Sequence, residues 1–538
     1  MAIGHWLKPL FLISLVGALY GWFLENPIVF DDLYFFILDE GGRSVVFDWY
    51  DWRPWLLRSL PYASLAWTAE IFGFGLIPFR IGNLILHIAV TLSLFYFLCA
   101  LLRSVLPEER RDTYHRPVFF AALLFGLHPV AVYAAGYLVQ RTTLMATLFA
   151  VLSMAAYLRG TASGVRRWAW ASVVLYYLAV FSKEHALMLP AAFVLLEGLL
   201  HPDWRQRVRA NWRVFAVCAA IALIVVLERK GLIGSAYELE ASSMLQDLGV
   251  EYPYPMSVLT QCWLFFKYGA LWLLPNPDWM SVDMREPFAK SFASVYWLAP
   301  VLFLAYGAVA ARLLLRRGRA GLVGFALLFP WVMFLTELAT VRIQEPFVLY
   351  RSYLWAIGGM AVLPVIAGAV RRRVAYSVVA ALTIAYIPIS VERLETFSHP
   401  YLLWDDAEKL VHGRNDAIGA YRIYYNRGTE CMKFLNFSCA ISDLKHSIAL
   451  YPGFPEAYGN LGSAYLQTGQ WQAAVDNLSQ AIQIDNEKQK PNWRHYWWRA
   501  QAYQGMGLQK ESVTDYAVTC LLNRKGCDKA GMPEPPLR

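Results

Sequence analysis

Two adjacent carboxylates, Asp31 and Asp32, lie in the apolar stretch NPIVFDDLYFF. A carboxyl group among aromatic side chains can have a raised pKa, because burial disfavours its charged form. Such a group can remove the proton of a hydroxyl as a general base, and a pair of carboxylates can also hold a divalent cation. Taken alone, the dipeptide is explained more simply as a helix N-cap or a solvated loop charge.

Several cationic residues lie at or near the ends of apolar runs. We expect these ends to be on the same side of a membrane as Asp31. A phosphate or diphosphate group needs donors of this kind, because guanidinium and ammonium groups form charge-assisted hydrogen bonds with it. The alternative is that each long side chain only reaches from an apolar helix to the polar interface. The candidate phosphate-binding residues are Arg141, Lys183, Arg351 and Arg53, and Arg80 is a further cation of this group.

Several polar residues beside these groups are candidate supporting residues. His128 ends an apolar run, and a lone histidine there is more often a hydrogen-bonded structural residue than a base. Glu184 directly follows Lys183 and can be its interfacial ion-pair partner. The supporting set is His128, Glu184, Tyr350, Glu345 and Asp278.

The composition predicts that these residues are positioned by membrane-spanning helices. Of the 538 residues, 57% are hydrophobic and only 16% are charged, whereas soluble domains carry roughly 25% charged residues. Residues 1–390 contain repeated apolar runs of roughly 20 residues, each long enough to cross a bilayer. Residues 391–538 are polar, with equal numbers of basic and acidic residues. The fold class is therefore predicted as all-α, with a polytopic membrane helix bundle at 1–390 and a separate domain at 391–538.

The basic residues predict the orientation of this bundle. The net charge of +8 comes from short connections between apolar runs, which is the positive-inside pattern rather than a nucleic-acid-binding surface. An odd number of spans with a cytoplasmic N-terminus puts the C-terminal domain outside. The predicted cytoplasmic connections are 103–116, 159–167, 201–213, 312–319 and 371–373. The eleven predicted spans are 6–24, 80–102, 117–135, 139–158, 168–182, 185–200, 213–228, 294–311, 320–340, 352–370 and 374–390.

Two further apolar stretches are assigned to the outer interface. Residues 256–275 are long enough to cross, but a crossing would move the arginines of 312–319 to the outer side. We therefore predict an interfacial or re-entrant segment there, and a second amphipathic one at 55–72.

The C-terminal domain contains a sequence repeat of 34 residues. Asn426-Arg427-Gly428 matches Asn460-Leu461-Gly462, and a third copy follows a four-residue insertion, with Ala464-Tyr465 matching Ala502-Tyr503. Small residues at fixed positions let paired helices approach closely. The pattern is that of tetratricopeptide repeats, and about three copies are enough for a stacked α-solenoid.

The cysteines of the C-terminal domain occur in two close pairs. Cys431 and Cys439 are eight residues apart, and Cys520 and Cys527 are seven apart. In a helical hairpin this spacing can join the two ends of a turn, so we predict two disulfides and an oxidising compartment. Four free thiols are the alternative, and the spacing does not match a zinc site.

The chain resembles the GT-C glycosyltransferases, most closely the TMTC-type proteins that join a multi-spanning membrane part to C-terminal tetratricopeptide repeats. Matching stretches occur in order over nearly the whole chain. FDDLYFF resembles the acidic motif of the first outer loop, and FSKEHALMLP resembles the KE segment between two spans. The matching stretches are 30–36, 52–55, 78–87, 128–149, 181–190, 275–279 and 345–355. Two of them depart from the family pattern, since GRAD is VQRT at 139–142 and ERVLYLPS is EPFVLYRS at 345–352.

The resemblance implies an inverting transfer of a sugar from a polyprenyl-phosphate-linked donor to a hydroxyl of a protein acceptor recruited by the repeats. Asp31 is the first choice for the general base and Asp32 the second. The departures and the short repeat array favour a bacterial relative in the inner membrane, with its repeats in the periplasm and a pilin or other envelope protein as acceptor. No cofactor is required, although a divalent cation can bind the acidic pair.

Two alternatives remain open from the sequence. The same fold can modify a lipid or a polysaccharide, with the repeats acting only as an assembly platform. The chain can also be a non-catalytic membrane scaffold whose repeats bind envelope partners. No Walker loop, dinucleotide-binding glycine fingerprint or HExxH motif occurs, so the sequence does not support nucleotide-driven chemistry.

Overall fold

The computed structural model describes residues 3–38, 43–106, 114–228, 249–292, 295–343, 345–414, 417–523 and 527. Contacts between Cα atoms divide the chain into two units, Met1–His399 and Pro400–Arg538. The sequence placed the boundary after residue 390. The structure divides the chain later because helix α18 (Arg372–Thr396) continues through that position without a break.

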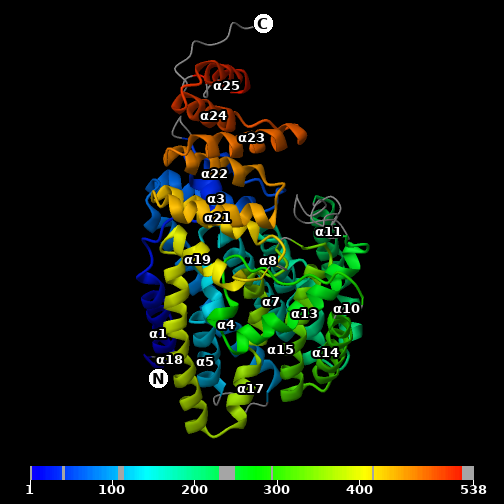
Figure 1. Ribbon diagram of the computed structural model, residues 1–538. Helices are drawn as coiled ribbons and strands as arrows, with labels where there is room; N and C mark the ends of the chain where they lie inside the picture. The colour runs from blue at the N-terminus through cyan, green and yellow to red at the C-terminus, as the bar shows by residue number, and fades with distance from the viewer. Residues whose placement is uncertain are drawn as a thin grey trace. The chain divides into compact units, whose positions relative to one another are not determined.

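The first unit is a bundle of helices, drawn from blue to yellow-green in Figure 1. In the described part of the chain the only β pairing is two isolated bridges, Leu38 with Ser44 and Met284 with Phe347. Besides α18, its α-helices are α1 (Ile3–Gly21), α2 (Asp32–Phe36), α3 (Ser59–Phe72), α4 (Leu76–Val105), α5 (His115–Gly126), α6 (Val132–Ala135), α7 (Arg141–Ser163), α8 (Arg166–Ser182), α9 (Leu189–Leu200), α10 (Trp204–Ala210), α11 (Trp212–Glu228), α13 (Pro253–Leu273), α14 (Leu298–Leu315), α15 (Gly318–Phe334), α16 (Ser352–Gly359) and α17 (Val362–Ala369).

Short 3₁₀ helices connect many of these α-helices, and several of them carry the polar residues singled out in the sequence. They are η1 (Val45–Trp49), η3 (Pro129–Ala131), η4 (Leu138–Gln140), η5 (Glu184–Ala186), η6 (Pro277–Trp279), η7 (Val295–Trp297), η8 (Leu335–Leu338) and η9 (Leu349–Arg351).

Five helical segments within the described residues are long and apolar enough to cross a membrane: 76–105, 138–163, 298–315, 318–338 and 372–396. The number rises to eight if each of three bent helix pairs counts as one span, at 115–135, 204–228 and 349–369. These eight coincide with eight of the eleven predicted spans. The other three predictions fall on α1, α8 and α9, which are shorter or less apolar.

The outer stretch predicted at 256–275 forms the continuous helix α13, which is not among the segments that meet those criteria. The stretch predicted at 55–72 forms α3, preceded by Arg58 in a left-handed backbone conformation. Both helices carry residues that shape the pocket described below.

The second unit contains three consecutive helical hairpins after helix α19 (Pro400–Val411). The hairpins follow the three predicted repeats and stack in chain order from orange to red in Figure 1. They are α20 (Tyr421–Lys433) with α21 (Phe437–Leu450), α22 (Pro455–Gln467) with α23 (Trp471–Glu487), and α24 (Trp493–Gly505) with α25 (Gln509–Leu522).

The packing inside the hairpins repeats with the period of the sequence. A Cβ atom added to Gly428 would meet Leu444 at 3.1 Å, and one added to Gly462 would meet Leu478 at 2.5 Å. Each glycine precedes its leucine by 16 residues, and the two contacts are 34 residues apart. The glycines therefore let the first helix lie directly against the second in the first two hairpins, as the repeat pattern predicted.

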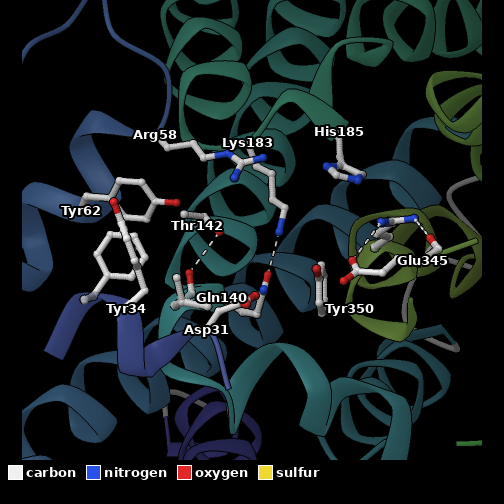
Figure 2. A pocket seen from close by; sticks show the side chains of 13 residues that line it. Asp31, Tyr34, Arg58, Tyr62, Gln140, Thr142, Lys183, His185, Glu345 and Tyr350 are labelled. Atoms are coloured by element: carbon white, nitrogen blue, oxygen red, sulfur yellow. Dashed lines mark hydrogen bonds and ion pairs between the residues drawn. The ribbon is translucent and has the colours of Figure 1, made fainter. Parts of the chain in front are cut away.

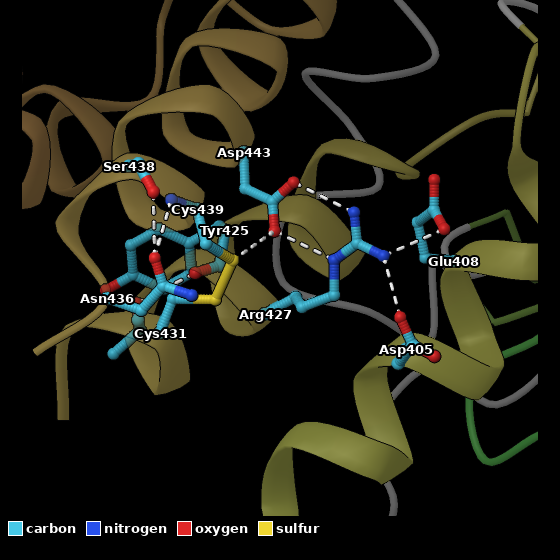
Figure 3. Close-up of a disulfide and its surroundings, with 10 residues drawn as sticks. Asp405, Glu408, Tyr425, Arg427, Cys431, Asn436, Ser438, Cys439 and Asp443 are labelled. Atoms are coloured by element: carbon cyan, nitrogen blue, oxygen red, sulfur yellow. Dashed lines mark hydrogen bonds and ion pairs between the residues drawn. A yellow bond between two sulfur atoms is a disulfide. The ribbon is translucent and has the colours of Figure 1, made fainter. Parts of the chain in front are cut away.

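Arg427 joins helix α19 to the first hairpin, as Figure 3 shows. Its guanidinium donates to both carboxylate oxygens of Asp443, at 2.8 and 2.9 Å, and to Asp405 and Glu408 at 3.1 and 2.8 Å. Burial lowers the pKa of Arg427, but the hydrogen bonds and charges of these carboxylates, Asp443 foremost, raise it by more. Arg499 and Asp515 form the same kind of pair in the third hairpin.

Both predicted cysteine pairs are disulfides in the structure. Cys431 at the end of α20 bonds to Cys439 at the start of α21, and Cys520 in α25 bonds to Cys527. The first disulfide therefore closes the turn of the first hairpin (Figure 3). Cys99, Cys218 and Cys262 are free thiols.

Candidate functional site

A polar pocket of about 260 Å³ in the first unit collects residues from five separate segments of the chain. Figure 2 shows Arg58 and Lys183 on one side of it and Asp31 beside Gln140 on the other. It therefore combines acidic and basic groups with aromatic walls. Its lining is Asp31, Tyr34, Phe35, Arg58, Tyr62, Val139, Gln140, Thr142, Lys183, His185, Glu345, Tyr350 and Arg351.

Lys183 is a buried cation of this pocket, with 5% of its surface exposed. Its Nζ donates to Gln140 Oε1 at 2.6 Å and Thr143 Oγ1 at 2.8 Å, and it lies 4.4 Å from the centre of the Tyr350 ring. Burial lowers the pKa of Lys183 well below its usual value, and the nearby charge of Arg58 lowers it further. An anion that enters the pocket would stabilise the ammonium form.

Arg58 is a second cation of the pocket and forms a two-pronged contact with Glu184. Its Nε donates to Glu184 Oε2 at 3.2 Å, and its Nη2 donates to Glu184 Oε1. The backbone of Arg58 has a φ of 62°, which is uncommon for a residue with a side chain. Its N–H donates to the carbonyl of Phe181, so this conformation ties the start of α3 to the end of α8.

Arg351 is the third cation, and a buried ionic network fixes it. Its Nη1 donates to Glu337 Oε2 at 3.3 Å and to the carbonyl of Glu345 at 3.2 Å. Glu337 is completely buried, with Arg342 Nε at 2.9 Å and His185 Nε2 at 3.2 Å from its carboxylate. Removing one partner of such a group leaves a buried charge unpaired, so Glu337 positions Arg351 strongly.

One face of α4 holds the loops that carry the acidic pair. Arg80, Asn83 and His87 are three and four residues apart, so they lie on the same side of the helix. Arg80 donates to the carbonyls of Asn26, Pro27 and Gly136 at 2.6 to 2.8 Å. Asn83 donates to the carbonyls of Tyr137 and Leu138, and His87 lies 2.7 Å from the hydroxyl of Tyr353.

Helix α13 holds the segment that carries Tyr350 and Arg351. The Tyr268 hydroxyl accepts from the N–H of Val348 at 2.8 Å and donates to its carbonyl at 3.1 Å. Gln261 donates to the carbonyl of Pro346 at 2.8 Å, and Trp272 donates to the Ser352 hydroxyl at 2.9 Å. The predicted outer stretch at 256–275 therefore has a positioning role.

The two adjacent carboxylates face different surroundings. Asp31 is exposed and lines the pocket, and its side chain makes no capping hydrogen bond to α2. Asp32 is fully buried outside the lining, and its Oδ1 accepts from the N–H of Val139 at 2.8 Å. Burial raises the pKa of Asp32 to about 7. Asp31 alone of the pair is placed to meet a ligand in this pocket.

Arg141 requires a correction, because it does not line the pocket. Its guanidinium donates to Asn83 Oδ1, the carbonyls of Ser64 and Phe79, and the Thr68 hydroxyl, at 2.8 to 3.1 Å. Only 3% of its surface is exposed. Its donors are thus used within the protein, and it braces α7 against α3 and α4 rather than facing a phosphate.

Four other candidates also lie outside the pocket lining, and one of them, Glu184, contacts the lining residue Arg58. Arg53 is exposed beyond the lining, and its place is taken by Arg58. His128 is buried, accepts from the N–H of Val130 at 3.2 Å and stacks on Trp272. Asp278 lies in η6, where its N–H is capped by the side chain of Asn276. The surroundings of His128 are those of the structural residue that the sequence favoured over a base. Arg53 and Asp278 do not take part in this pocket as a phosphate ligand and a secondary acid.

Sequence reasoning missed Arg58 and most of the uncharged lining. The signal that selects Arg58 over Arg53 is the left-handed turn before α3, which the letters WRPWLLRSLP do not reveal. His185 follows the predicted pair Lys183-Glu184 directly, and Gln140 precedes Arg141. His185 lines the pocket in addition to Lys183, whereas Gln140 lines it in place of Arg141.

A divalent cation at the acidic pair finds little support in the geometry. Within the described ranges, three side chains that could ligate a metal ion come close together at Cys431, Cys439 and Asp443, but the two cysteines form a disulfide. Asp31 and Asp32 are not part of such a group among the described residues. Asp32 also directs one carboxylate oxygen to a backbone N–H.

Comparisons with known proteins identify the repeats of the second unit. The sequence profile of the tetratricopeptide repeat matches residues 444–476, which run from α21 into α23. A crystal structure of MamA protein shares 24% sequence identity over 30% of this chain and 85% of that chain, with a TM-score of 0.21. No curated protein matches the chain. The helices of the structure and the repeat match over residues 444–476 show an all-α protein with C-terminal tetratricopeptide repeats.

Proposed function

We propose that this chain is a membrane glycosyltransferase that transfers a sugar from a polyprenyl-phosphate-linked donor to a hydroxyl of a protein acceptor. The observation that carries the proposal is the meeting of Asp31 with Arg58, Lys183 and Arg351 in one pocket. A carboxylate beside three cations suits a reaction in which a hydroxyl loses a proton while a phosphate gains charge.

In the proposed step, the acceptor oxygen forms a bond to the anomeric carbon while the bond from that carbon to the phosphate oxygen breaks. The hydroxyl proton passes to the Asp31 carboxylate, and the phosphate leaves with the electron pair. Arg58, Lys183 and Arg351 stabilise the leaving phosphate as its charge grows. A single displacement inverts the anomeric configuration.

The size of the pocket favours a small transferred group. Ligand pockets usually occupy about 300 to 1,000 Å³, and this one has about 260 Å³. We therefore propose that one sugar rather than an oligosaccharide is transferred. The polyprenyl tail would lie in lipid outside the pocket, with the protein in the bacterial inner membrane and the pocket and repeats on the periplasmic side.

The repeats would recruit the protein acceptor, because stacked helical hairpins form extended binding surfaces. Their presence also favours a second candidate function, a scaffold without catalysis that binds envelope partners. A third candidate, transfer to a lipid or polysaccharide, uses the same pocket with a different acceptor.

The test uses the full-length protein in lipid vesicles with a polyprenyl-phosphate-linked sugar and envelope proteins. We expect Asp31→Asn to lower the rate at least 100-fold, since general base catalysis contributes about that much or more. We expect Arg58→Gln to raise the donor Kd. Asp51→Asn, an exposed carboxylate outside the pocket, is the matched control and should retain normal activity.

Intact-mass analysis of the products distinguishes the candidates. Sugar on protein supports the proposal, and sugar only on glycolipid supports the lipid acceptor. If Asp31→Asn and Arg58→Gln both transfer sugar at the wild-type rate, the assigned roles are wrong. If the wild-type protein transfers none but its repeats still capture an envelope protein, the scaffold is correct.

A further inference from the structure

A second pocket, of about 520 Å³, is lined by arginines from three connections that are far apart in the sequence. Arg116 and Arg319 are the second residues of α5 and α15, and Arg372 is the first residue of α18. The sequence predicted the three connections 103–116, 312–319 and 371–373 on the cytoplasmic side of the membrane. The structure brings one arginine from each of them to the same hollow.

The pocket has the polarity of a site for a molecule with an anionic end and an apolar end. None of the described residues that line it is acidic. Its other walls are apolar or aromatic, including Phe120, Val370 and Tyr376. The rings of Phe120 and Tyr376 pack edge to face at 5.3 Å, and Arg116 donates to the Tyr376 hydroxyl at 3.0 Å. These contacts give the pocket a fixed wall.

The two pockets lie at opposite ends of the same helical elements. From Arg319 to Glu337, which holds Arg351 of the first pocket, the chain runs along α15 and η8 for about 27 Å at 1.5 Å per residue. This length is close to the thickness of the hydrocarbon core of a bilayer, about 30 Å. α16 and α17 also connect the pockets, since Arg351 lines the first and Gly368 lines the second.

We infer that the arginine pocket binds the phosphate headgroup of an anionic phospholipid of the leaflet opposite the first pocket. Basic pockets between helices on the cytoplasmic side attract such headgroups electrostatically, and the apolar wall suits the start of an acyl chain. The inference rests on the membrane location in the proposed function, but not on sugar transfer.

The test measures lipid binding to the detergent-solubilised full-length protein by native mass spectrometry. Phosphatidylglycerol, phosphatidylcholine of the same chain length and inorganic phosphate are titrated separately. We expect phosphatidylglycerol to bind at least tenfold more tightly than phosphatidylcholine. The double variant Arg319→Gln/Arg372→Gln should bind it about thirtyfold more weakly than wild type.

The matched control is Arg316→Gln/Arg371→Gln, which removes two exposed arginines from the same connections but outside the pocket lining. It should keep the wild-type affinity within about twofold. If the double variant does not fold, the single variants carry the test, each with an expected loss of about fivefold.

Three outcomes would overturn the inference: equal affinity for the two lipids, an equal loss in the control, or displacement of phosphatidylglycerol by equimolar inorganic phosphate. The last outcome would make the pocket a site for free phosphate. Because neither sugar donor nor acceptor is present, failure here leaves the transferase proposal untouched, and failure of sugar transfer leaves this result untouched.

Discussion

Asp32 is completely buried and accepts one hydrogen bond from Val139, while its neighbour Asp31 faces the pocket. Burial raises the pKa of Asp32 from 3.8 to about 7. The folded protein therefore holds this proton more tightly than the unfolded chain does. It follows that the contribution of Asp32 to stability is present at acidic pH and is lost as the pH rises from about 4 to about 7.

We predict that Asp32→Asn stabilises the protein at pH 8, by up to about 4 kcal/mol, because the amide can accept the same hydrogen bond without a buried charge. The difference from wild type should close between pH 7 and pH 4. Thermal unfolding of the detergent-solubilised protein over this range measures it, with Asp51→Asn as the exposed control. A variant that is less stable than wild type at pH 8 would show that the ionised carboxylate has a stabilising partner.

Lys183 should make donor binding depend on pH. Its pKa is lowered by burial and by Arg58, and the phosphate needs its ammonium form. We therefore predict that donor affinity falls as the pH rises through this lowered pKa, by up to tenfold per pH unit. Lys183→Arg should flatten the dependence, because a guanidinium stays protonated. Binding of a radiolabelled donor measures it, with Lys290→Arg as the exposed control, and identical pH profiles for wild type and Lys183→Arg would exclude this role.

Individual site residues were predictable from type and context, but their contacts were not. Asp31, Lys183 and Arg351 were found because charged residues are rare in so apolar a chain, and all three line the pocket. Arg141 met the same criterion, but its guanidinium donates hydrogen bonds to carbonyls and side chains of α3 and α4. Arg58 depends on a left-handed turn, which is a property of the folded backbone.

At the scale of helices, hydropathy predicted where the apolar helices lie better than it predicted where they bend or break. Eight predicted spans coincide with apolar helices or bent pairs in the structure. The span at 117–135 bends by 49° where Pro129 follows His128, because proline lacks the N–H that would continue the helix. The span predicted at 185–200 begins only at Leu189, since η5 first turns Glu184 and His185 toward their partners. Helix α9 is therefore shorter at its N-terminal end than the apolar run predicted, because the polar residues of η5 precede it.

Gly324 is a point of very close approach between α14 and α15. A Cβ atom on Gly324 would lie 2.1 Å from the backbone nitrogen of Leu314 and 2.6 Å from its Cα, and backbone atoms cannot yield as a side chain can. We predict that Gly324→Ala separates the two helices and destabilises the protein by about 1–3 kcal/mol. Because α15 leads to Glu337, the variant should also weaken donor binding.

Gly269→Ala in α13 is the matched control for that variant. No heavy atom lies within 4 Å of the added Cβ, and alanine is the better helix former by up to about 1 kcal/mol. It should therefore leave the unfolding midpoint unchanged or raise it. Equal midpoints for both variants in thermal unfolding would mean that α14 and α15 can separate without cost.

On the scale of the whole molecule, α18 runs from the arginine pocket to the end of the first unit, where the chain continues into the repeats. α18 begins at Arg372 of the arginine pocket and spans about 37 Å at 1.5 Å per residue. At its far end, the carbonyl of Leu394 accepts from Asn26, and Phe397 packs 6.1 Å from Tyr137. The chain therefore leaves the first unit at the end where Asp31 lies, so a membrane that separates the two pockets puts the first pocket and the start of the repeat unit on one side.

The cysteines test this arrangement, because only one side of the bacterial inner membrane is oxidising. We predict that, in cells quenched with acid and then denatured, Cys431, Cys439, Cys520 and Cys527 resist alkylation until a reductant is added. Mass spectrometry should then find three alkylated cysteines before reduction and seven after it. Cys99, Cys218 and Cys262 are the internal control, since they react in both samples once the chain is unfolded. Seven alkylated cysteines without reductant would put the repeats in a reducing compartment, and the first pocket would then face the cytoplasm, where the proposed acceptor proteins of the envelope do not occur.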